Sequence, residues 1–365
     1  MRTASLTPLF QQSGPFATVV LDVSQDSENA RHGHELRTRA ACESLAEQGA
    51  DEQVVSAVSE RLAETVHRPA PVSRLVVATG DGVVHDVTAG FRADQPVATW
   101  GPLPDLATWI ARQDSVRHFV LVMVDHTGGS VAVYDSDVPQ AEEETTVQGE
   151  TEFVHKVPTG GWSALRYQHV TENVWAQNAE QVADEAVKAV RAGHHLVLLA
   201  GDPQSRPHVL DTLAGTPATV VELETGSRAE DGGDEALQQA IREALMDQVV
   251  QSRLALTHEL RDRLGRDHAV ATGTRDVTDA FVRGQVETLL LDPQPAAGLT
   301  LDLSEHPGLA VGAGELTGEV RADQALVAAA VITGADVAVS PQATLGGAPV
   351  AALLRWDQDA VGSTA

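Results

Sequence analysis

Apolar and polar positions along this chain alternate in short blocks that switch between the period of a strand and that of a helix. β-branched runs bounded by turn residues predict strands, and apolar residues three or four apart predict helices. The first third predicts a strand, two helices, a hairpin and a short helix, at residues 17–23, 27–48, 51–66, 74–87 and 106–111. Ser27 is the expected N-cap of the first helix.

The same reading continues to the end of the chain and defines three regions. The middle predicts elements at residues 119–124, 131–134, 171–191, 196–200, 207–213, 219–223 and 234–264. The last third predicts elements at residues 269–272, 274–283, 286–291, 323–333, 337–340 and 350–355. We therefore predict an α/β protein of three domains (1–114, 115–266 and 267–365), each a small mixed sheet with helices packed on it.

The composition narrows the class of protein. No run approaches the roughly 18 apolar residues that cross a bilayer, and the first residues lack the basic-then-apolar order of a secretory signal. We therefore expect a cytoplasmic protein with no membrane partner. The one cysteine, Cys42, lies in a predicted helix, which favours a small buried side chain and excludes an intramolecular disulfide.

The net charge of −27, from 52 acidic and 25 basic residues, argues against general affinity for nucleic acid, and DNA is not expected as a partner. Any contact with RNA is therefore local. Because Lys156 and Lys188 are the only lysines, arginine supplies nearly all the positive charge. Arg31, Arg37 and Arg39 are candidates for RNA contact in the first domain, and ion pairs with nearby acids are an equal alternative.

The sequence lacks the strong signatures of common enzyme chemistry, including a nucleophile elbow, a zinc-protease motif and a phosphate-binding loop. His32 and His34 offer two imidazoles with no third ligand nearby. We therefore expect no metal site and no cofactor. Asp125 and His126 follow a predicted strand, where such residues more often shape a turn than act in catalysis.

The exception is the run GGWSALRY at residues 160–167. Gly160 and Gly161 allow close backbone approach, and the indole of Trp162 can stack on a base. Cationic and polar side chains flank them: His155, Lys156, Ser163 and Arg166. These features predict a loop that enters an RNA-lined cavity. The alternative is an indole that anchors the loop to its own domain.

This run resembles the catalytic loop of archaeo-eukaryotic release factors, in which Gly-Gly-Gln precedes Ser-Ala-Leu-Arg-Phe and a long helix. DVTDAFVRGQVETLL at residues 276–290 and LGGAPVAALLRW at residues 345–356 are similar to the carboxy-terminal domain of release factors and Pelota. The resemblance spans residues 115–356 and is strongest to the bacterial branch of this superfamily, which includes Balon-like ribosome hibernation factors and actinobacterial relatives. The first domain lacks the stop-codon-reading motifs.

The resemblance implies a protein that occupies the A site of the bacterial ribosome and contacts the rRNA of both subunits. Its first domain is expected to face the small subunit, and its third domain to contact a translational GTPase such as elongation factor Tu. Since Trp162 replaces the glutamine that positions water, we expect a hibernation or protection factor rather than an enzyme. A rescue factor that hydrolyses peptidyl-tRNA and a non-ribosomal binding protein remain as alternatives.

Overall fold

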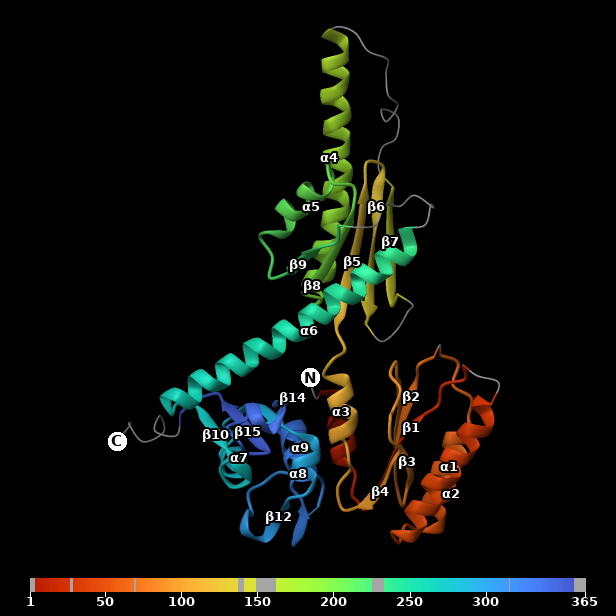
Figure 1. Cartoon of the computed structure of the whole chain (residues 1–365), viewed down its shortest axis with the longest axis vertical. Coiled ribbons are helices and arrows are strands. Elements are labelled where there is room, and N and C mark those ends of the chain that lie inside the picture. The colour runs from red at the N-terminus through yellow and green to blue at the C-terminus, as the bar shows by residue number, and fades with distance from the viewer. Residues whose placement is uncertain are drawn as a thin grey trace. The chain divides into compact units, whose positions relative to one another are not determined.

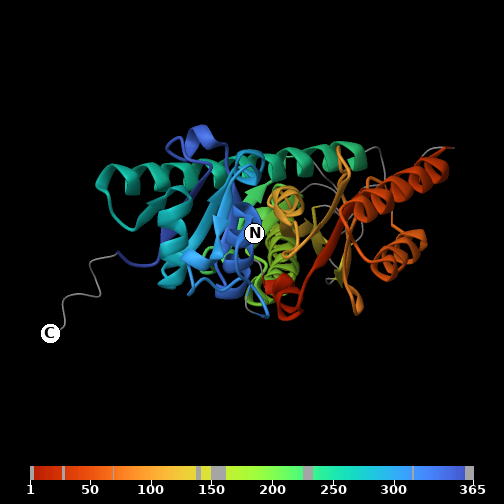
Figure 2. The same cartoon turned by 90° about the horizontal axis from the view of Figure 1, so that it is seen from below.

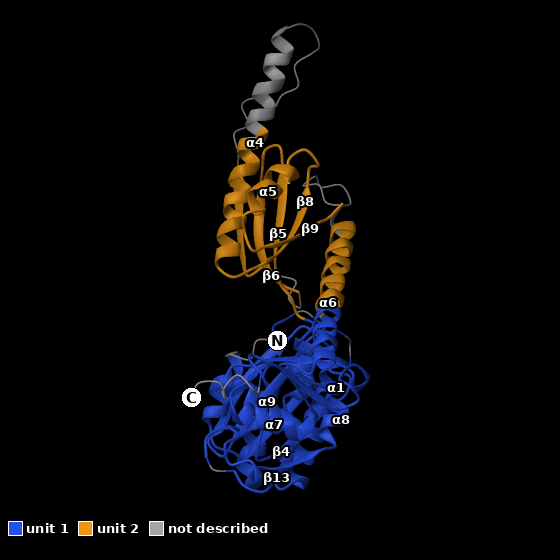
Figure 3. Cartoon of the chain, turned by 90° about the vertical axis from the view of Figure 1, so that its left-hand side faces the viewer, with its two compact units in different colours: residues 1–115, 253–365 blue, residues 116–252 orange. Residues whose placement is uncertain are grey.

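The structure is a computed structural model. It describes residues 4–26, 29–68, 70–136, 141–148, 162–224, 233–314 and 316–357, with the backbone alone at 4, 162–174, 233 and 234. The chain divides into two compact units (Figure 3). Unit 1 comprises residues 1–115 and 253–365, and unit 2 comprises residues 116–252. The predicted α/β class is confirmed, whereas the division into three domains stays a prediction.

The first part of unit 1 is built on a four-stranded antiparallel sheet in the order β3-β2-β1-β4. Its strands are β1 (Phe16–Asp22), β2 (Ser73–Thr79), β3 (Gly82–Ala89) and β4 (Val97–Gly101). Two consecutive helices, α1 (Ala30–Glu47) and α2 (Glu52–Ala63), connect β1 to β2. Their apolar residues bury one face of the sheet, with Leu45, Val58 and Leu62 fully enclosed. Figure 1 shows α1 and α2 beside this sheet.

The second part of unit 1 contains another four-stranded sheet, in the order β10-β15-β11-β14. Its strands are β10 (Val270–Thr272), β11 (Val286–Leu291), β14 (Asp336–Val339) and β15 (Val350–Leu354), and only β11 and β14 run parallel. The helices are α7 (Gly273–Val282), α8 (Pro293–Ala297) and α9 (Ala322–Thr333). Two short strands, β12 (Thr300–Asp302) and β13 (Glu319–Arg321), and the 3₁₀ turns η2 (Leu303–Glu305) and η3 (Gln342–Thr344) complete it.

One hydrophobic core joins the two parts of unit 1. The second face of the first sheet contributes Val20, Leu75 and Val77, and α9 contributes residues buried on all sides. Between them lie a 3₁₀ helix, η1 (Ala4–Gln11), and α3 (Ala107–Gln113). Segments from both ends of the sequence therefore bury the same apolar surface.

A buried ionic cluster lies within this joint core. Arg321 binds Asp105 from the first part and Asp323 from the second, each at 2.6 Å. Asp105 and Asp323 are 5% and 1% exposed. Burial raises the pKa of Asp105, and the Arg321 charge opposes that rise.

Unit 2 is one five-stranded sheet in the order β7-β6-β5-β8-β9. The strands are β5 (His118–Asp125), β6 (Gly128–Asp135), β7 (Glu143–Gln148), β8 (Leu196–Gly201) and β9 (Thr219–Glu222). β5, β8 and β9 run parallel, whereas β6 and β7 are antiparallel additions. The helices α4 (Trp162–Arg191) and α5 (Arg206–Leu213) pack on one face of this sheet.

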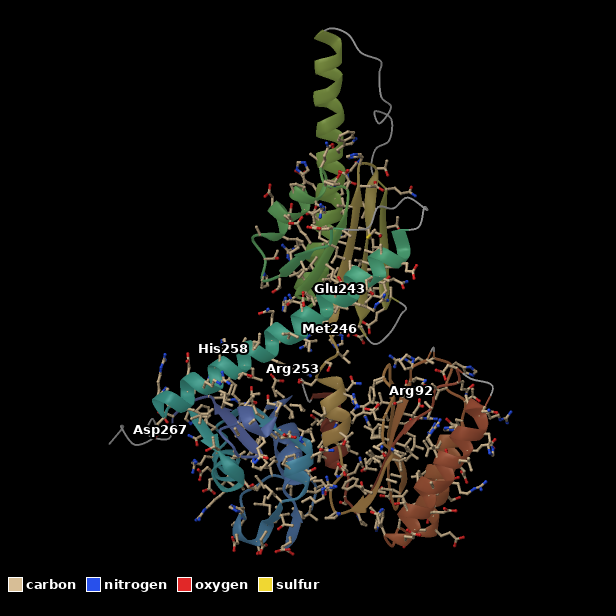
Figure 4. The ribbon with its side chains drawn as sticks, in the orientation of Figure 1. Arg92, Glu243, Met246, Arg253, His258 and Asp267 are labelled. Carbon is tan, nitrogen blue, oxygen red and sulfur yellow. The ribbon has the colours of Figure 1, made fainter. Side chains whose placement is uncertain are left out.

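The helix α6 (Gly233–Arg266), teal in Figure 2, contains residues of both units. In unit 2 its Leu237, Ile241 and Leu245 cover the second face of the sheet. In unit 1, Leu260 is buried beside β11 and β15, and Arg253 donates to Ser115 Oγ at 3.3 Å. Figure 4 labels Arg253 on α6. No helix in the described residues is long and apolar enough to span a membrane.

Most predicted helices and strands are confirmed within a few residues, but some were missed. The predicted cap Ser27 lies outside the described residues, and α1 begins at Ala30. α4 begins at Trp162, nine residues before the predicted start. The short or polar elements η1, β4, β7, α8, β12 and β13 were not predicted.

Candidate functional site

The run GGWSALRY divides at the first residue of α4. Gly160 and Gly161, with His155 and Lys156, lie outside the described residues. Trp162, Ser163 and Arg166 belong by their backbone to the first turns of α4. The prediction that these three residues lie in a loop is therefore wrong for the backbone, because the helix extends to Trp162. The structure brings them together on one helix and does not describe their side chains.

The lower half of α4 is fixed to the sheet of unit 2 along one apolar stripe. Five of the six apolar residues at helical spacing are at most 1% exposed, and Val187 is partly buried; the five are Ala179, Val182, Ala183, Ala186 and Val190. Their burial holds α4 against the sheet. Gly129 of β6 permits this close approach, since a Cβ there would lie 2.3 Å from Met123 O and 2.9 Å from Val182 Cγ2.

At the carboxyl ends of β5 and β8, a polar and aromatic cluster holds α4. His126 stacks on Trp175 of α4, with ring centroids 3.8 Å apart and planes inclined by 19°. Asn178, one turn further along α4 and 1% exposed, donates from Nδ2 to His126 O at 2.9 Å. His126, in the turn after β5, therefore contacts α4 through both its imidazole ring and its backbone carbonyl.

Asp202, which follows β8, completes this cluster. Its Oδ2 accepts from the backbone N–H of Gln204 and Ser205, each at 2.8 Å, and from Ser205 Oγ at 3.1 Å. Its Oδ1 lies 3.4 Å from His126 Nε2. Since Ser205 is 1% exposed and donates to a carboxylate, it is not placed as a nucleophile. The geometry supports anchoring of α4 rather than catalysis.

Parallel sheets commonly bind ligands where neighbouring strands send their connections in opposite directions, as β5 and β8 do here. In unit 2 the rings of His126 and Trp175 lie at that position. The sequence indicated a turn at Asp125 and His126 but not the contact of His126 with α4. The predicted turn role is confirmed for Asp125, whose Oδ1 accepts from Thr127 N at 2.6 Å.

The three candidate arginines of the first domain lie on α1 in different surroundings. Arg37 donates from Nε to Asp22 O at 3.1 Å and is tied to the end of β1. Arg31 pairs with Glu35 at 3.6 Å, and its side chain is 92% exposed. Arg39 is exposed and forms no ion pair with any described residue. The alternative of ion pairing thus holds for Arg37 and Arg31.

Arg31 and Arg39 line a groove of about 590 Å³ between α1, the end of α2 and the segment after β1. His34, Thr38 and Cys42 of α1 also line it, one helical turn apart. Burial raises the pKa of the Cys42 thiol, which keeps it protonated. We call this groove, which the sequence did not predict, the α1 groove. Among the described residues no cluster of three or more His, Cys, Asp or Glu side chains could hold a metal ion.

Comparison with known proteins gives a family match for one stretch of the chain. Residues 118–266 match the model of bacterial archaeo-eukaryotic release factor family 2. This stretch is therefore similar to the bacterial branch of the archaeo-eukaryotic release factor superfamily. The matched residues include the whole of α4 and the run GGWSALRY. This match to the release factor family is thus limited to a stretch that contains nearly all of unit 2.

Two other comparisons extend over nearly the whole chain. The uncharacterized Mycobacterium tuberculosis protein Rv2629 is 26% identical over 368 residues, which cover 98% of this chain and 97% of that protein. Pelota from Archaeoglobus fulgidus is 15% identical, with a TM-score of 0.32 and coverage of 97% and 92%. Dom34 from Saccharomyces cerevisiae, a translation termination-like factor, is 9% identical, with a TM-score of 0.39 and coverage of 98% and 94%.

Proposed function

We propose that this protein occupies the A site of the bacterial ribosome without hydrolysing peptidyl-tRNA, and thereby protects idle or stalled ribosomes. The observation that carries the proposal is Trp162, at the first position of a 30-residue helix, where related release factors have the catalytic glutamine. The family match supports it, because the matched residues contain this position. In the proposed complex, Gly160, Gly161 and Trp162 face the peptidyl transferase centre.

We propose binding rather than hydrolysis because of the chemistry of the Trp162 side chain. A glutamine carboxamide can hold a water molecule against an ester, and an indole has one N–H donor and no acceptor. The loss of one preorganised group of this kind lowers the rate by about 10²–10³. Stacking of an aromatic side chain on a base contributes about 1–3 kcal/mol per base. Trp162 therefore favours occupancy over turnover.

The proposed RNA contacts are few and local, because the whole chain has a net charge of −27. His155, Lys156, Ser163 and Arg166 supply contacts near Trp162. Arg31 and Arg39 of α1 supply contacts to the small subunit, and Arg37 supports them by holding α1 to Asp22. A contact between the third domain and a translational GTPase such as elongation factor Tu is part of the proposal.

The test compares wild-type protein with Trp162→Ala and Trp162→Phe on vacant ribosomes and on ribosomes that carry labelled peptidyl-tRNA. We expect the wild type to co-sediment with ribosomes and to release no peptide. Trp162→Phe retains a stacking ring and is expected to bind nearly as well, whereas Trp162→Ala is expected to bind about ten-fold more weakly.

Each alternative gives a different result in the same assay. Peptide release that Gly161→Ala abolishes would identify a rescue factor and contradict the proposal. The absence of co-sedimentation, with or without elongation factor Tu and GTP, would indicate a non-ribosomal binding protein.

A further inference from the structure

The floor of the α1 groove is polar where a helix interface is normally apolar. His34 Nε2 lies 2.8 Å from Leu62 O of α2, so Nε2 carries the proton and donates to that carbonyl. His34 Nδ1 is then a lone-pair acceptor in the neutral ring. Nδ1 and Thr38 Oγ1 are both buried, and neither has a hydrogen-bond partner among the described residues. Burying such atoms without partners destabilises the free protein.

Two arginines line the groove, and Arg39 is the one that forms no ion pair with a described residue. Arg31 is paired with Glu35, and Glu64 is paired with Arg61 at 2.9 Å and Arg74 at 3.4 Å. Arg39 has no such pair in the described part of the chain. In a protein with 52 acidic residues, a guanidinium that pairs with no described carboxylate beside a groove favours an anionic ligand.

We propose that the α1 groove binds a nucleoside monophosphate, either as a free nucleotide or as one unit of an RNA strand. Arg39 binds the phosphate at the rim. Thr38 Oγ1 and His34 Nδ1 bind polar groups of the nucleoside at the floor. Val23, Ala63 and Val66 line the groove and provide apolar contacts for the base.

The size and chemistry of the groove support this class of ligand over a bare anion. Its volume of about 590 Å³ exceeds what a phosphate ion needs and lies within the roughly 300–1,000 Å³ of small-molecule sites. A nucleotide combines an anionic group with hydroxyl and amine donors, which the acceptor at His34 Nδ1 requires. The exocyclic amine of adenine offers two N–H donors and uracil offers one ring N–H, so AMP is expected to bind more tightly than UMP.

The test uses the isolated full-length protein at about 0.15 M salt, where long-range repulsion is largely screened. AMP, UMP, inorganic phosphate and a single-stranded RNA hexamer are titrated by calorimetry. We expect one saturable site for AMP, weaker binding of UMP, and the weakest binding of phosphate. Binding of the hexamer but not of AMP would support the proposal with RNA as the source of the nucleotide.

The decisive variant is Thr38→Val, which replaces the unpartnered hydroxyl by a methyl group of similar size. It is expected to weaken nucleotide binding by about ten-fold, while the Tm of the free protein stays the same or rises. A hydroxyl with a merely structural role would lower the Tm instead. Arg39→Gln is expected to weaken binding of every phosphate-bearing probe without a change in Tm.

Thr212→Val is the matched control. Thr212 Oγ1 donates to His208 O at 3.0 Å in α5, outside the α1 groove. Its substitution should leave nucleotide binding unchanged. The proposal is overturned if no nucleotide or RNA binds, or if Thr38→Val and Arg39→Gln bind as the wild type does. Because no ribosome is present, such a result would leave the proposed ribosomal function standing.

Discussion

The two compact units differ in how the sequence builds their cores. In unit 1, residues from the two ends of the chain share one hydrophobic core and one buried ionic cluster. In unit 2, a continuous segment forms a sheet with α4 and α5 on one face and α6 on the other. Unit 1 therefore depends on contacts between residues far apart in sequence, whereas the contacts of unit 2 are more local.

This difference suggests separate roles. Unit 2 carries the family match and the long helix that begins at Trp162. Unit 1 joins the predicted first and third domains through α3, η1 and α9. A change in the shared core of unit 1 should therefore affect both ends of the chain, and a change in unit 2 should remain local.

The largest expected effect is that of Ile110→Ala in α3. Ile110 is 0% exposed and lies in the shared core. The cavity should lower the free energy of unfolding of unit 1 by about 2–5 kcal/mol. Hydrogen exchange should increase in residues 4–115 and 253–357 together. Leu199→Ala, in the core of unit 2, is the matched control and should increase hydrogen exchange in unit 2 alone. If Ile110→Ala increases exchange in only one of the two segments of unit 1, the shared core is refuted.

Arg321→Met should have the next largest effect. It leaves Asp105 and Asp323 buried without their guanidinium partner. Since the Arg321 side chain is 34% exposed, we expect a loss of about 2 kcal/mol rather than the full cost of a buried unpaired charge. Chemical denaturation measures it. An unchanged midpoint would mean that the cluster does not contribute to joining the two parts.

A smaller effect is expected for the anchor of α4 in unit 2. His126→Ala removes the ring stacked on Trp175 and should cost about 1 kcal/mol. Hydrogen exchange should increase around residues 175–183 and not in unit 1. His126→Phe keeps a stacking ring and should restore protection, whereas equal exchange in both variants would argue against the stack.

The pH dependence of Asp105 should give the smallest effect, because Arg321 offsets much of the penalty of burial. The pKa of Asp105 is higher in the folded protein than in the unfolded chain, so folding favours proton uptake by this group. Its unfavourable contribution is present at neutral pH and is relieved as the pH falls toward the raised pKa. The stability of the wild type relative to Asp105→Asn should therefore rise on acidification, and a relative fall would contradict this account.

The sequence predicted elements whose apolar pattern is strong and missed those without one. The buried stripe of α4 follows directly from its helical spacing. By contrast, β7 reads EETTVQ and is almost wholly exposed, so no alternation marks it as a strand. It forms because β6 offers a free sheet edge. Such pairing depends on the assembled sheet rather than on local sequence.

The joint core and the α1 groove could be found only from the structure, for a similar reason. A signal for the joint core was present in α9, in which all residues from Ala322 to Val331 are buried; an apolar helix of that kind needs cover on every side. A signal for the groove was the spacing of His34, Thr38 and Cys42, which lie one helical turn apart on the same face of α1. The sequence could not show that α2 ends beside them or that Arg39 has no ion pair among the residues that the structure describes.

The most direct test of the central proposal is cryo-electron microscopy of bacterial ribosomes incubated with this protein. The account predicts density for the protein in the A site, with the helix that begins at Trp162 directed toward the peptidyl transferase centre and the peptidyl-tRNA ester intact. Ribosomes without such density at saturating protein concentration, or density with the Trp162 end of that helix turned away from the catalytic centre, would contradict it.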